Sequence, residues 1–324
     1  MLDNLIFSVN TVLPLCFFVL LGVFLRNKKM FTQEFFSGVD KFVFKLALPC
    51  MIFLDVLECD VSQLTDVSLI SFVVIGITLS VAVLYVTVPL FVKEKARQGA
   101  FIQGVYRSNF AVLGVSLAGG LAGDDGLAAI AVAMPFTIVL FNAYAVVTLS
   151  VFTERENRQS AKAVVLTVLK DIISNPLIIA TATALIFMLI RENFGFELPT
   201  AALSIAERLA DTVYAMAMIS LGASMTKESF GDGKLKTAIV AAALKTVVLP
   251  AVAVTVAALL GFTGARICVV FVLFGAPSAI SSYIMAKNMK SDAELAGQIL
   301  LVSTIMSLGT IFAGVFILKT IGLI

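Results

Sequence analysis

The chain has 324 residues, of which 60% are hydrophobic and only 14% are charged, and its mean hydropathy is +1.05. These values exclude a water-soluble protein, because so apolar a chain needs lipid around most of its length. The net charge of +2 is too small to indicate nucleic acid as a partner, and the absence of histidine excludes Ser-His-Asp and Cys-His nucleophiles, HExxH zinc sites and histidine proton relays.

Ten long apolar runs, bounded by charged residues or by Gly and Pro, predict ten membrane-spanning helices. In chain order they cover residues 5–25, 42–57, 67–92, 98–122, 126–152, 164–190, 200–225, 235–260, 265–287 and 293–318. The runs are too long and too continuous for the strands of a transmembrane barrel. The first run is also too long for a signal peptide and ends at Arg26 without a small-residue cleavage site, so we expect it to be retained.

Basic residues are concentrated in the loops that follow the odd-numbered helices. These loops hold 15 of the 23 Lys and Arg residues, namely Arg26, Lys28, Lys29, Lys41, Lys93, Lys95, Arg97, Arg155, Arg158, Lys162, Lys227, Lys234, Lys236, Lys287 and Lys290. The even-numbered loops and the two termini hold only Arg191, Arg266 and Lys319. The positive-inside rule therefore places the odd loops in the cytoplasm and both termini on the non-cytoplasmic side.

Two halves of the chain, residues 1–160 and 161–324, each contain five predicted helices. Because five is odd, the second half would have the opposite orientation to the first, so we expect an inverted repeat, a common transporter plan. At an offset of 167 residues the order of long, short and polar-interrupted helices recurs, although identities such as Met51 with Met218 are few.

The fourth and ninth predicted helices hold equivalent places in the two halves and are polar at mid-depth. The fourth carries Tyr106, Arg107, Ser108 and Asn109 between Gly104 and Gly114, and the ninth carries Gly275 and Pro277, followed by Ser278, Ser281, Ser282 and Tyr283. We expect both helices to break there, with Gly104, Gly114, Gly275 and Pro277 as break residues. Half-helix N-termini meeting at the midplane suit an anionic substrate. The alternative is that the small residues only allow close helix packing.

A few polar residues lie too deep in the predicted helices to reach water. Arg107 is roughly 14 Å along its helix, and its planar guanidinium suits a substrate carboxylate. The alternative is a structural salt bridge with Asp55 or Asp211. Asn109 offers both a donor and an acceptor, which favours contact with substrate or with a backbone gap over simple helix association.

Other deep or clustered charges have two readings as well. Lys245 is a candidate proton-coupling group, because a buried lysine readily changes its protonation, or else a fixed counter-charge. Glu207, Arg208 and Asp211 are spaced to form a local charge cluster on the seventh helix, with a structural role. Neither interrupted helix contains an acidic residue, so Na⁺ there would depend on carbonyls and hydroxyls.

Five segments resemble the auxin efflux carrier family, whose bacterial branch includes malonate, malate and other small-carboxylate permeases. They are FVFKLALPCMIF ending at Phe53, RSNFAVLG from Arg107 to Gly114, SNPLIIA around Pro176, ADTVYAMAMISLGASM ending at Met225, and APSAISSYIMA around Pro277 followed by ILLVSTIMSL. The resemblance runs through nearly the whole chain. One departure is Ser116, where relatives often have a proline, so the fourth helix would break closer to Asn109 and Gly114.

The resemblance implies an all-α integral membrane protein with ten helices in two inverted repeats. It implies a scaffold of helices 1, 2, 6 and 7, a mobile transport unit of helices 3–5 and 8–10, elevator-like motion, a homodimer, and a bacterial inner membrane location. Carried over to this sequence, Asn109 with Arg107 matches the family's polar site on helix 4, and Pro277 with Ser278 matches the crossing on helix 9.

Residues and resemblance together predict a secondary active transporter of small organic anions, either mono- or dicarboxylates or auxin-like acids. Arg107 and the half-helix N-termini would compensate the substrate's charge, while Asn109, Ser278 and Ser281 orient it. Coupling would use H⁺ or Na⁺, with Lys245, Asp55 and Asp211 as candidate groups. The alternative is a sodium-coupled or uncoupled carrier of a cation or neutral solute on the bile-acid-symporter-like fold.

The missing residue types argue against an intramembrane enzyme, which would need a nucleophile with a base or a metal site. The chain has no GxSxG motif and no paired acidic motif within a span. Its four cysteines, Cys16, Cys50, Cys59 and Cys268, include no CxxC pair. We therefore expect no disulfide framework, metal site or cofactor.

Overall fold

A computed structural model describes residues 2–59, 66–153, 166, 169–225 and 234–324. Within these ranges the chain is helical apart from turns, connecting segments and one isolated antiparallel bridge. Of the basic residues used above to orient the loops, Arg155, Arg158, Lys162 and Lys227 lie outside the described residues.

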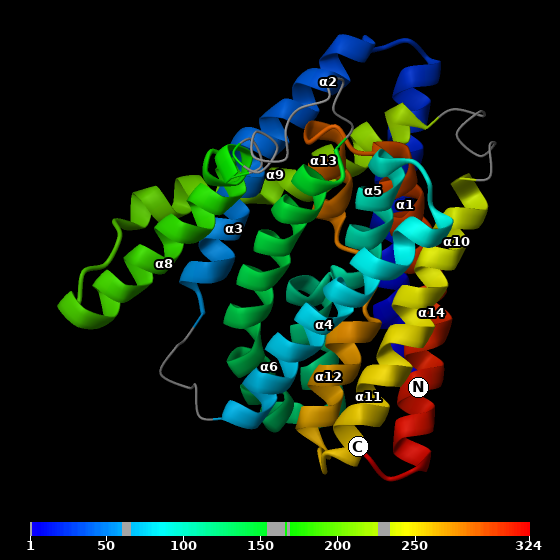
Figure 1. Ribbon diagram of the computed structural model, residues 1–324. Coiled ribbons are helices and arrows are strands. Elements are labelled where there is room, and N and C mark those ends of the chain that lie inside the picture. The colour runs from blue at the N-terminus through cyan, green and yellow to red at the C-terminus, as the bar shows by residue number, and fades with distance from the viewer. Residues whose placement is uncertain (1, 60–65, 154–165, 167–168, 226–233) are drawn as a thin grey trace.

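The helices follow one another in a single bundle of long and short elements (Figure 1). In chain order they are α1 (Leu2–Asn27), α2 (Gln33–Phe42), the π-helical turn η1 (Val43–Ala47), α3 (Leu48–Leu57), α4 (Val67–Phe91), α5 (Lys95–Tyr106), α6 (Phe110–Val151), α8 (Pro176–Phe194), α9 (Thr200–Ser224), α10 (Lys234–Ala243), the π-helical turn η4 (Leu244–Val248), α11 (Leu249–Leu259), α12 (Ala265–Gly275), α13 (Ile280–Asn288) and α14 (Ala293–Thr320).

The number of candidate membrane spans is smaller than the number of apolar runs. Five described helices are long and apolar enough to cross a membrane: Val67–Phe91, Leu113–Val151, Pro176–Phe194, Lys234–Leu259 and Ala293–Thr320. Two shorter apolar helices cover Leu13–Asn27 and Ala265–Gly275. The membrane-type helical class is thus confirmed, while ten spans in an inverted repeat stay a prediction.

Gly123 divides the longest helix into two. Its φ of +58° and ψ of −140° are not helical, so α6 folds sharply at this residue, at the boundary expected between the fourth and fifth helices. Glycine reaches this conformation without the steric cost that a Cβ would bring. The two parts then lie very close, because a Cβ on Gly126 would collide with the carbonyl oxygen of Ala118.

The second helix begins nine residues earlier than the apolar run predicted. Thr32 caps α2 by accepting a hydrogen bond from the backbone N–H of Phe35 at 3.3 Å. The first turns of α2 are polar on one side, with Phe36 and Asp40 buried on the other. A search for continuous apolar residues does not detect such an amphipathic start.

Each π-helical turn is followed by a leucine and then a proline. In η1 the N–H of Leu48 bonds to the carbonyl of Val43, and in η4 the N–H of Leu249 bonds to the carbonyl of Leu244. Pro49 and Pro250 have no N–H, and their rings crowd the carbonyl four residues earlier, which widens the preceding turn.

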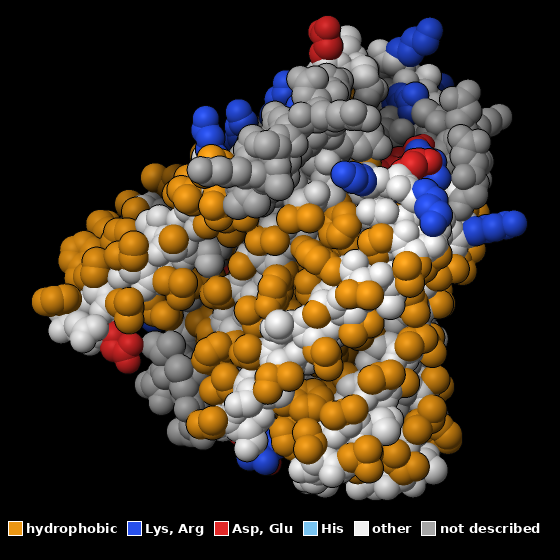
Figure 2. Space-filling view, viewed as in Figure 1, with side chains coloured by type: hydrophobic (Ala, Val, Ile, Leu, Met, Phe, Trp, Pro, Cys, Tyr) orange, Lys and Arg blue, Asp and Glu red, His pale blue; other side chains and the backbone are white. Residues whose placement is uncertain are grey.

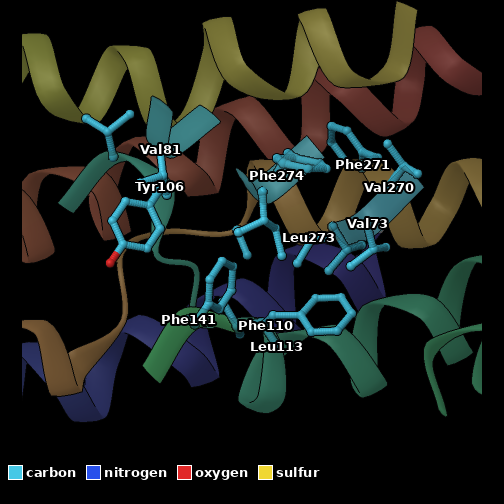
Figure 3. Close-up of a cluster of buried hydrophobic side chains, with 14 of the residues drawn as sticks. Val73, Val81, Tyr106, Phe110, Leu113, Phe141, Val270, Phe271, Leu273 and Phe274 are labelled. Atoms are coloured by element: carbon cyan, nitrogen blue, oxygen red, sulfur yellow. The ribbon is translucent and has the colours of Figure 1, made fainter. Parts of the chain in front are cut away.

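The buried apolar side chains form two main clusters. The larger one joins α4, α5, α6, α10, α11, α12 and α14, and Figure 3 shows part of it, with Phe110 and Phe141 lying near Leu273. The second joins α1, η1, α3, α9 and α13 with parts of α6, α8 and α14. The helix bundle is therefore built around two cores.

Small residues bring α1 and α9 into close contact in the second core. A Cβ on Gly22 would collide with the carbonyl oxygen of Ile219, and one on Gly222 with that of Val19. Arg26, at the end of α1, donates hydrogen bonds of 3.0 and 3.1 Å to carbonyls at the end of α9. Such close packing through glycine is typical of helices in a membrane.

The outer surface is apolar on its flanks. Figure 2 shows hydrophobic side chains covering most of the flank that faces the viewer, while Lys and Arg side chains gather at the upper end. The exposed large hydrophobic residues come from many helices, for example Val86 on α4, Ile173 ahead of α8, and Leu259 on α11. A surface of this kind is suited to a bilayer.

Candidate functional site

The breaks in the two interrupted helices lie against each other. The chain is extended between α5 and α6 and again between α12 and α13. Ser108 and Ser278 form an antiparallel bridge, and the backbone N–H of Asn109 donates to the carbonyl oxygen of Pro277 at 2.8 Å. The fourth and ninth predicted helices therefore cross where the sequence analysis expected them to break.

Neighbouring hydroxyls and carbonyls satisfy polar groups that the breaks release. The N–H of Ser278 donates to the hydroxyl of Ser303 on α14 at 3.1 Å. The hydroxyl of Ser108 donates to the carbonyl of Ala276 at 3.5 Å. Pro277 has no N–H that needs a partner, so the break costs fewer hydrogen bonds there.

The predicted break residues fall into two groups. Gly275 ends α12, close to Pro250, and Pro277 lies within the break. Gly104 and Gly114 lie inside α5 and α6 instead, where a Cβ would crowd Ile299 and the side chain of Ile130 respectively. These two glycines therefore allow close packing on either side of the break rather than forming it.

Two helix N-termini point at the crossing. α6 and α13 both begin there, and the first backbone N–H groups of a helix have no partner within the helix. Together with the helix dipole, they give the crossing a partial positive charge. This geometry suits a carboxylate or another small anion.

A cavity of about 410 Å³ lies between the crossing and the helices α3 and α9. The crossing contributes Asn109, Ala279, Ile280 and Ser281, α3 contributes Met51, Leu54, Asp55 and Glu58, and α9 contributes Glu207, Ala210, Asp211, Val213 and Tyr214. Five residues singled out from the sequence, Asn109, Ser281, Asp55, Glu207 and Asp211, thus line one cavity. Its volume is within the range of small-molecule sites.

The wall opposite the crossing is acidic. Asp55, Glu58, Glu207 and Asp211 line it, and no Lys or Arg does. None of the four carboxylates forms an ion pair with any residue that the structure describes. Sequence reasoning expected Glu207 and Asp211 to form a local cluster with Arg208, which does not line the cavity.

Arg107 is buried at the crossing, but its side chain points elsewhere. It is 5% exposed, does not line the cavity, and donates a hydrogen bond of 2.7 Å to the side-chain oxygen of Asn142 on α6. A second guanidinium nitrogen, Nη1, donates to the sulfur of Met285 on α13. The partner that the structure gives it is therefore Asn142, rather than Asp55 or Asp211.

Asn142 was not singled out from the sequence. It is 3% exposed and lies within a run that has no other amide and no charged side chain, so a single deep amide was the available signal. Its pairing with Arg107 depends on α6 folding back beside α5, which hydropathy does not reveal.

Lys245 is fully buried in η4 and does not line the cavity. η4 packs against α5, α12 and α14. The ammonium nitrogen has no hydrogen-bond partner among the residues that the structure describes. The lysine is therefore deep inside the bundle, as its position in the sequence predicted, but separate from Asp55 and Asp211.

At the opposite end from the cavity, α13 is bound to α2 and α9. Lys287 pairs with Asp40 at 2.5 Å, and the side-chain amide of Asn288 donates to the carbonyl of Asp40 at 3.3 Å. The hydroxyl of Tyr283 donates to that of Ser224 on α9 at 3.3 Å. We call these three contacts the α13 latch. From the sequence, Lys287 served only to orient a loop, and Asp40 was not singled out.

A charge network joins α5, α10 and α14. Asp292, which caps α14, lies 3.6 Å from Arg97 and 3.7 Å from Lys234. Lys234 also pairs with Glu294, and the N–H of Asp292 donates to the carbonyl of Ala96 at 3.1 Å. These contacts hold the starts of the three helices together.

The chain is similar to known proteins along nearly its whole length. The model of a family described as Membrane transport protein matches residues 7–313. A protein of Methanothermobacter thermautotrophicus, described as an uncharacterized transporter, is 24% identical over 307 residues, which cover 93% of this chain and 95% of that protein. Another, from Methanocaldococcus jannaschii and also described as an uncharacterized transporter, is 23% identical over 311 residues, with the same two coverages. Neither description names a substrate.

Proposed function

We propose that this chain, which belongs to the membrane transport protein family, is a secondary active transporter of small organic anions. The auxin efflux carriers, which its motifs resemble, belong to the same family. The substrates would be mono- or dicarboxylates such as malate and malonate, or auxin-like acids. One observation carries the proposal: the N-termini of α6 and α13 converge on a cavity that Asn109 and Ser281 line.

The proposed mechanism is elevator-type alternating access. One unit, α4–α6 with α10–α14, would move against a scaffold of α1, α2, α3, α8 and α9. The two apolar cores and the charge network around Asp292 support this division, although α13 shares the core of the scaffold. The cavity also lies at the boundary between the two units, as alternating access requires.

The proposal includes ten spans in two inverted repeats, residues 1–160 and 161–324. Its support is the recurrence of helix starts: Thr200 comes 167 residues after Gln33, and Lys234 comes 167 residues after Val67. The broken helices α5–α6 and α12–α13 follow in the same order in each half.

The remaining parts of the proposal come from the charge pattern of the sequence and from its resemblance to the auxin efflux carriers. They are a bacterial inner membrane location with both termini on the non-cytoplasmic side, a homodimer through the scaffold, and coupling to H⁺ or Na⁺. Lys245 is a candidate coupling group because its ammonium is buried without a partner among the described residues. Asp55 and Asp211 are candidates because they line the cavity.

A second candidate function has an observation in its favour. The acidic wall of the cavity suits a cationic solute, carried with or without Na⁺ as on the bile-acid-symporter-like fold. Uptake of a cationic or neutral solute that requires Na⁺, with no uptake of carboxylates, would favour this alternative over the anion carrier.

Counterflow in proteoliposomes tests the main proposal. Loaded with unlabelled carboxylate, the vesicles should accumulate the same labelled carboxylate. Asn109→Ala should raise the half-saturating concentration about tenfold or more, because a hydrogen bond to a charged group contributes about 1.5–3 kcal/mol. Asn193→Ala, on the exposed end of α8, is the matched control and should leave it unchanged. If no carboxylate exchanges, the anion proposal is wrong.

Arg107 needs a separate experiment, because Asn142 holds its side chain in the state described here. A role in compensating the substrate's charge would require Arg107 to release Asn142 at another point in the cycle. Arg107→Ala would then raise the half-saturating concentration for carboxylates. An unchanged affinity would assign Arg107 to structure alone.

A further inference from the structure

We infer that the substrate carries a cationic group as well as its carboxylate, so that the site takes a zwitterion or an amino acid rather than a plain carboxylate. The inference rests on the proposed transport function, but it replaces the plain carboxylates named there with carboxylates that also carry an ammonium group. It comes from the unequal polarity of the two walls of the 410 Å³ cavity.

The crossing wall offers hydrogen-bond donors. Ser281 is 6% exposed, lines the cavity, and its hydroxyl has no partner among the described residues. The side chain of Asn109 also lines the cavity without such a partner. With the N-termini of α6 and α13 beside them, these groups are placed to receive a carboxylate.

The scaffold wall has the opposite character. Two carboxylates from α3 and two from α9 face the same space: Asp55, Glu58, Glu207 and Asp211. A dicarboxylate bound at the crossing would hold its second negative charge toward these four. A substrate ammonium in that place would be attracted by them instead.

No cation of the protein neutralises the acidic wall within the described structure. Arg107 is engaged by Asn142 behind the crossing, and Arg191 donates to the carbonyls of Leu57 and Cys59. Arg208 neighbours Glu207 in sequence but does not line the cavity. Glu58, Glu207 and Asp211 are exposed and Asp55 is half-buried, so their charges are open to a cationic group that enters the cavity.

An organic ammonium fits the spacing of the carboxylates better than a metal ion does. Among the described residues, no group of three or more Asp, Glu, Cys or His side chains is close enough to hold a metal ion. An ammonium needs no such compact set of ligands. The ring of Tyr214, which also lines the cavity, offers an aromatic face for a cation.

Counterflow with matched substrate pairs tests the inference. Alanine is compared with propionate, and aspartate with succinate, since each pair differs only by the α-ammonium group. The ammonium member should exchange at least tenfold faster at equal concentration. Asp55→Asn and Asp211→Asn should each reduce this ratio, while Glu34→Gln, on the exposed start of α2, should not. Because the ratio is measured within one vesicle preparation, differences in the amount of folded protein cancel.

The outcomes separate the inference from the proposed function. Equal exchange of both members, with a ratio unaffected by Asp55→Asn and Asp211→Asn, overturns the zwitterion inference and leaves the carboxylate transporter intact. Exchange of ethylamine but of no carboxylate overturns the anion proposal and with it the inference. Preference for the ammonium member that is lost in both Asp variants supports the two together.

Discussion

Asn142 is the residue on which the buried charge of Arg107 depends. Both side chains are at most 5% exposed, and the hydrogen bond between them is 2.7 Å long. A guanidinium inside a membrane protein is costly unless it has an acceptor. The stability of the crossing is therefore sensitive to a residue that does not line the cavity.

We predict that Asn142→Leu lowers the free energy of unfolding by about 2–4 kcal/mol, because it leaves the guanidinium of Arg107 without this acceptor. Asn142→Asp keeps an acceptor and should remain close to the wild type. Thermal unfolding in detergent measures both. Equal stability of all three proteins would contradict a structural role for the hydrogen bond.

At this scale the sequence predicted which residues are deep but not what they touch. Depth along a helix follows from counting residues between charged ends, and Arg107 and Lys245 are both buried as predicted. Partners depend on the rotation of each helix about its axis and on the fold at Gly123. The pairing of Arg107 with Asn142 required the structure for that reason.

Ser303 connects the broken helix to its neighbour. Its hydroxyl accepts the N–H of Ser278 and donates to the carbonyl of Leu300 within α14. Ser303→Ala leaves a buried N–H without its acceptor, so we expect the free energy of unfolding to fall by about 1–3 kcal/mol. Ser307→Ala is the control on the same helix, since its hydroxyl bonds only to Thr304 among the described residues, and should cost less. A smaller loss in Ser303→Ala than in the control would argue against this connection.

Gly104 sets the distance between α5 and α14. A Cβ at this position would lie 2.8 Å from a methyl carbon of Ile299. We expect Gly104→Ala to destabilise the protein by about 1–3 kcal/mol through overpacking, and Ile299→Ala to recover part of that loss in the double variant. Gly38→Ala, which meets open space, should not destabilise. Thermal unfolding of Gly104→Ala, Ile299→Ala, the double variant and Gly38→Ala, each compared with wild type, decides between packing and a backbone role for Gly104.

The positions of the elements were more predictable than their internal geometry. Long apolar runs marked α4, α9 and α14 to within a few residues, because lipid demands continuous hydrophobic sequence. Pro277 marked the break before α13. The π-helical turns and the early start of α2 were not predicted, since they arise from local hydrogen bonding and capping rather than from hydropathy.

For the molecule as a whole, the cavity and the α13 latch lie at opposite ends of the same helices. Asp40 and Asp55 are 15 residues apart along α2, η1 and α3, which is roughly 22 Å at 1.5 Å per residue. Ser224 and Asp211 are similarly separated on α9. In Figure 1, α13 and α2 lie together at the upper end.

The acidic side of the cavity could not be predicted from the sequence, because it joins residues of α3 and α9 that hydropathy places only within helices.

We predict that the α13 latch must open for the cavity to be reached from the basic end of the molecule. Asp40→Asn removes the ion pair between Lys287 and the carboxylate of Asp40, which is almost fully buried. Losing about 1–2 kcal/mol of attraction between these two side chains would raise the population of the open state roughly 5- to 30-fold. Thiol labelling of Ser224→Cys, in a background that lacks the four native cysteines, measures this opening.

The reversed pair Asp40→Lys with Lys287→Asp is the control for this prediction. If the attraction between the two side chains closes the latch, the reversed pair should restore slow labelling, because it recreates an ion pair between α2 and α13. Glu34→Gln, also on α2 but in its exposed first turn, should leave the labelling rate unchanged. Slow labelling in Asp40→Asn would show that apolar packing of α13 against α9 holds this end closed without the ion pair. Fast labelling in the reversed pair would show that the attraction between these two side chains does not close it.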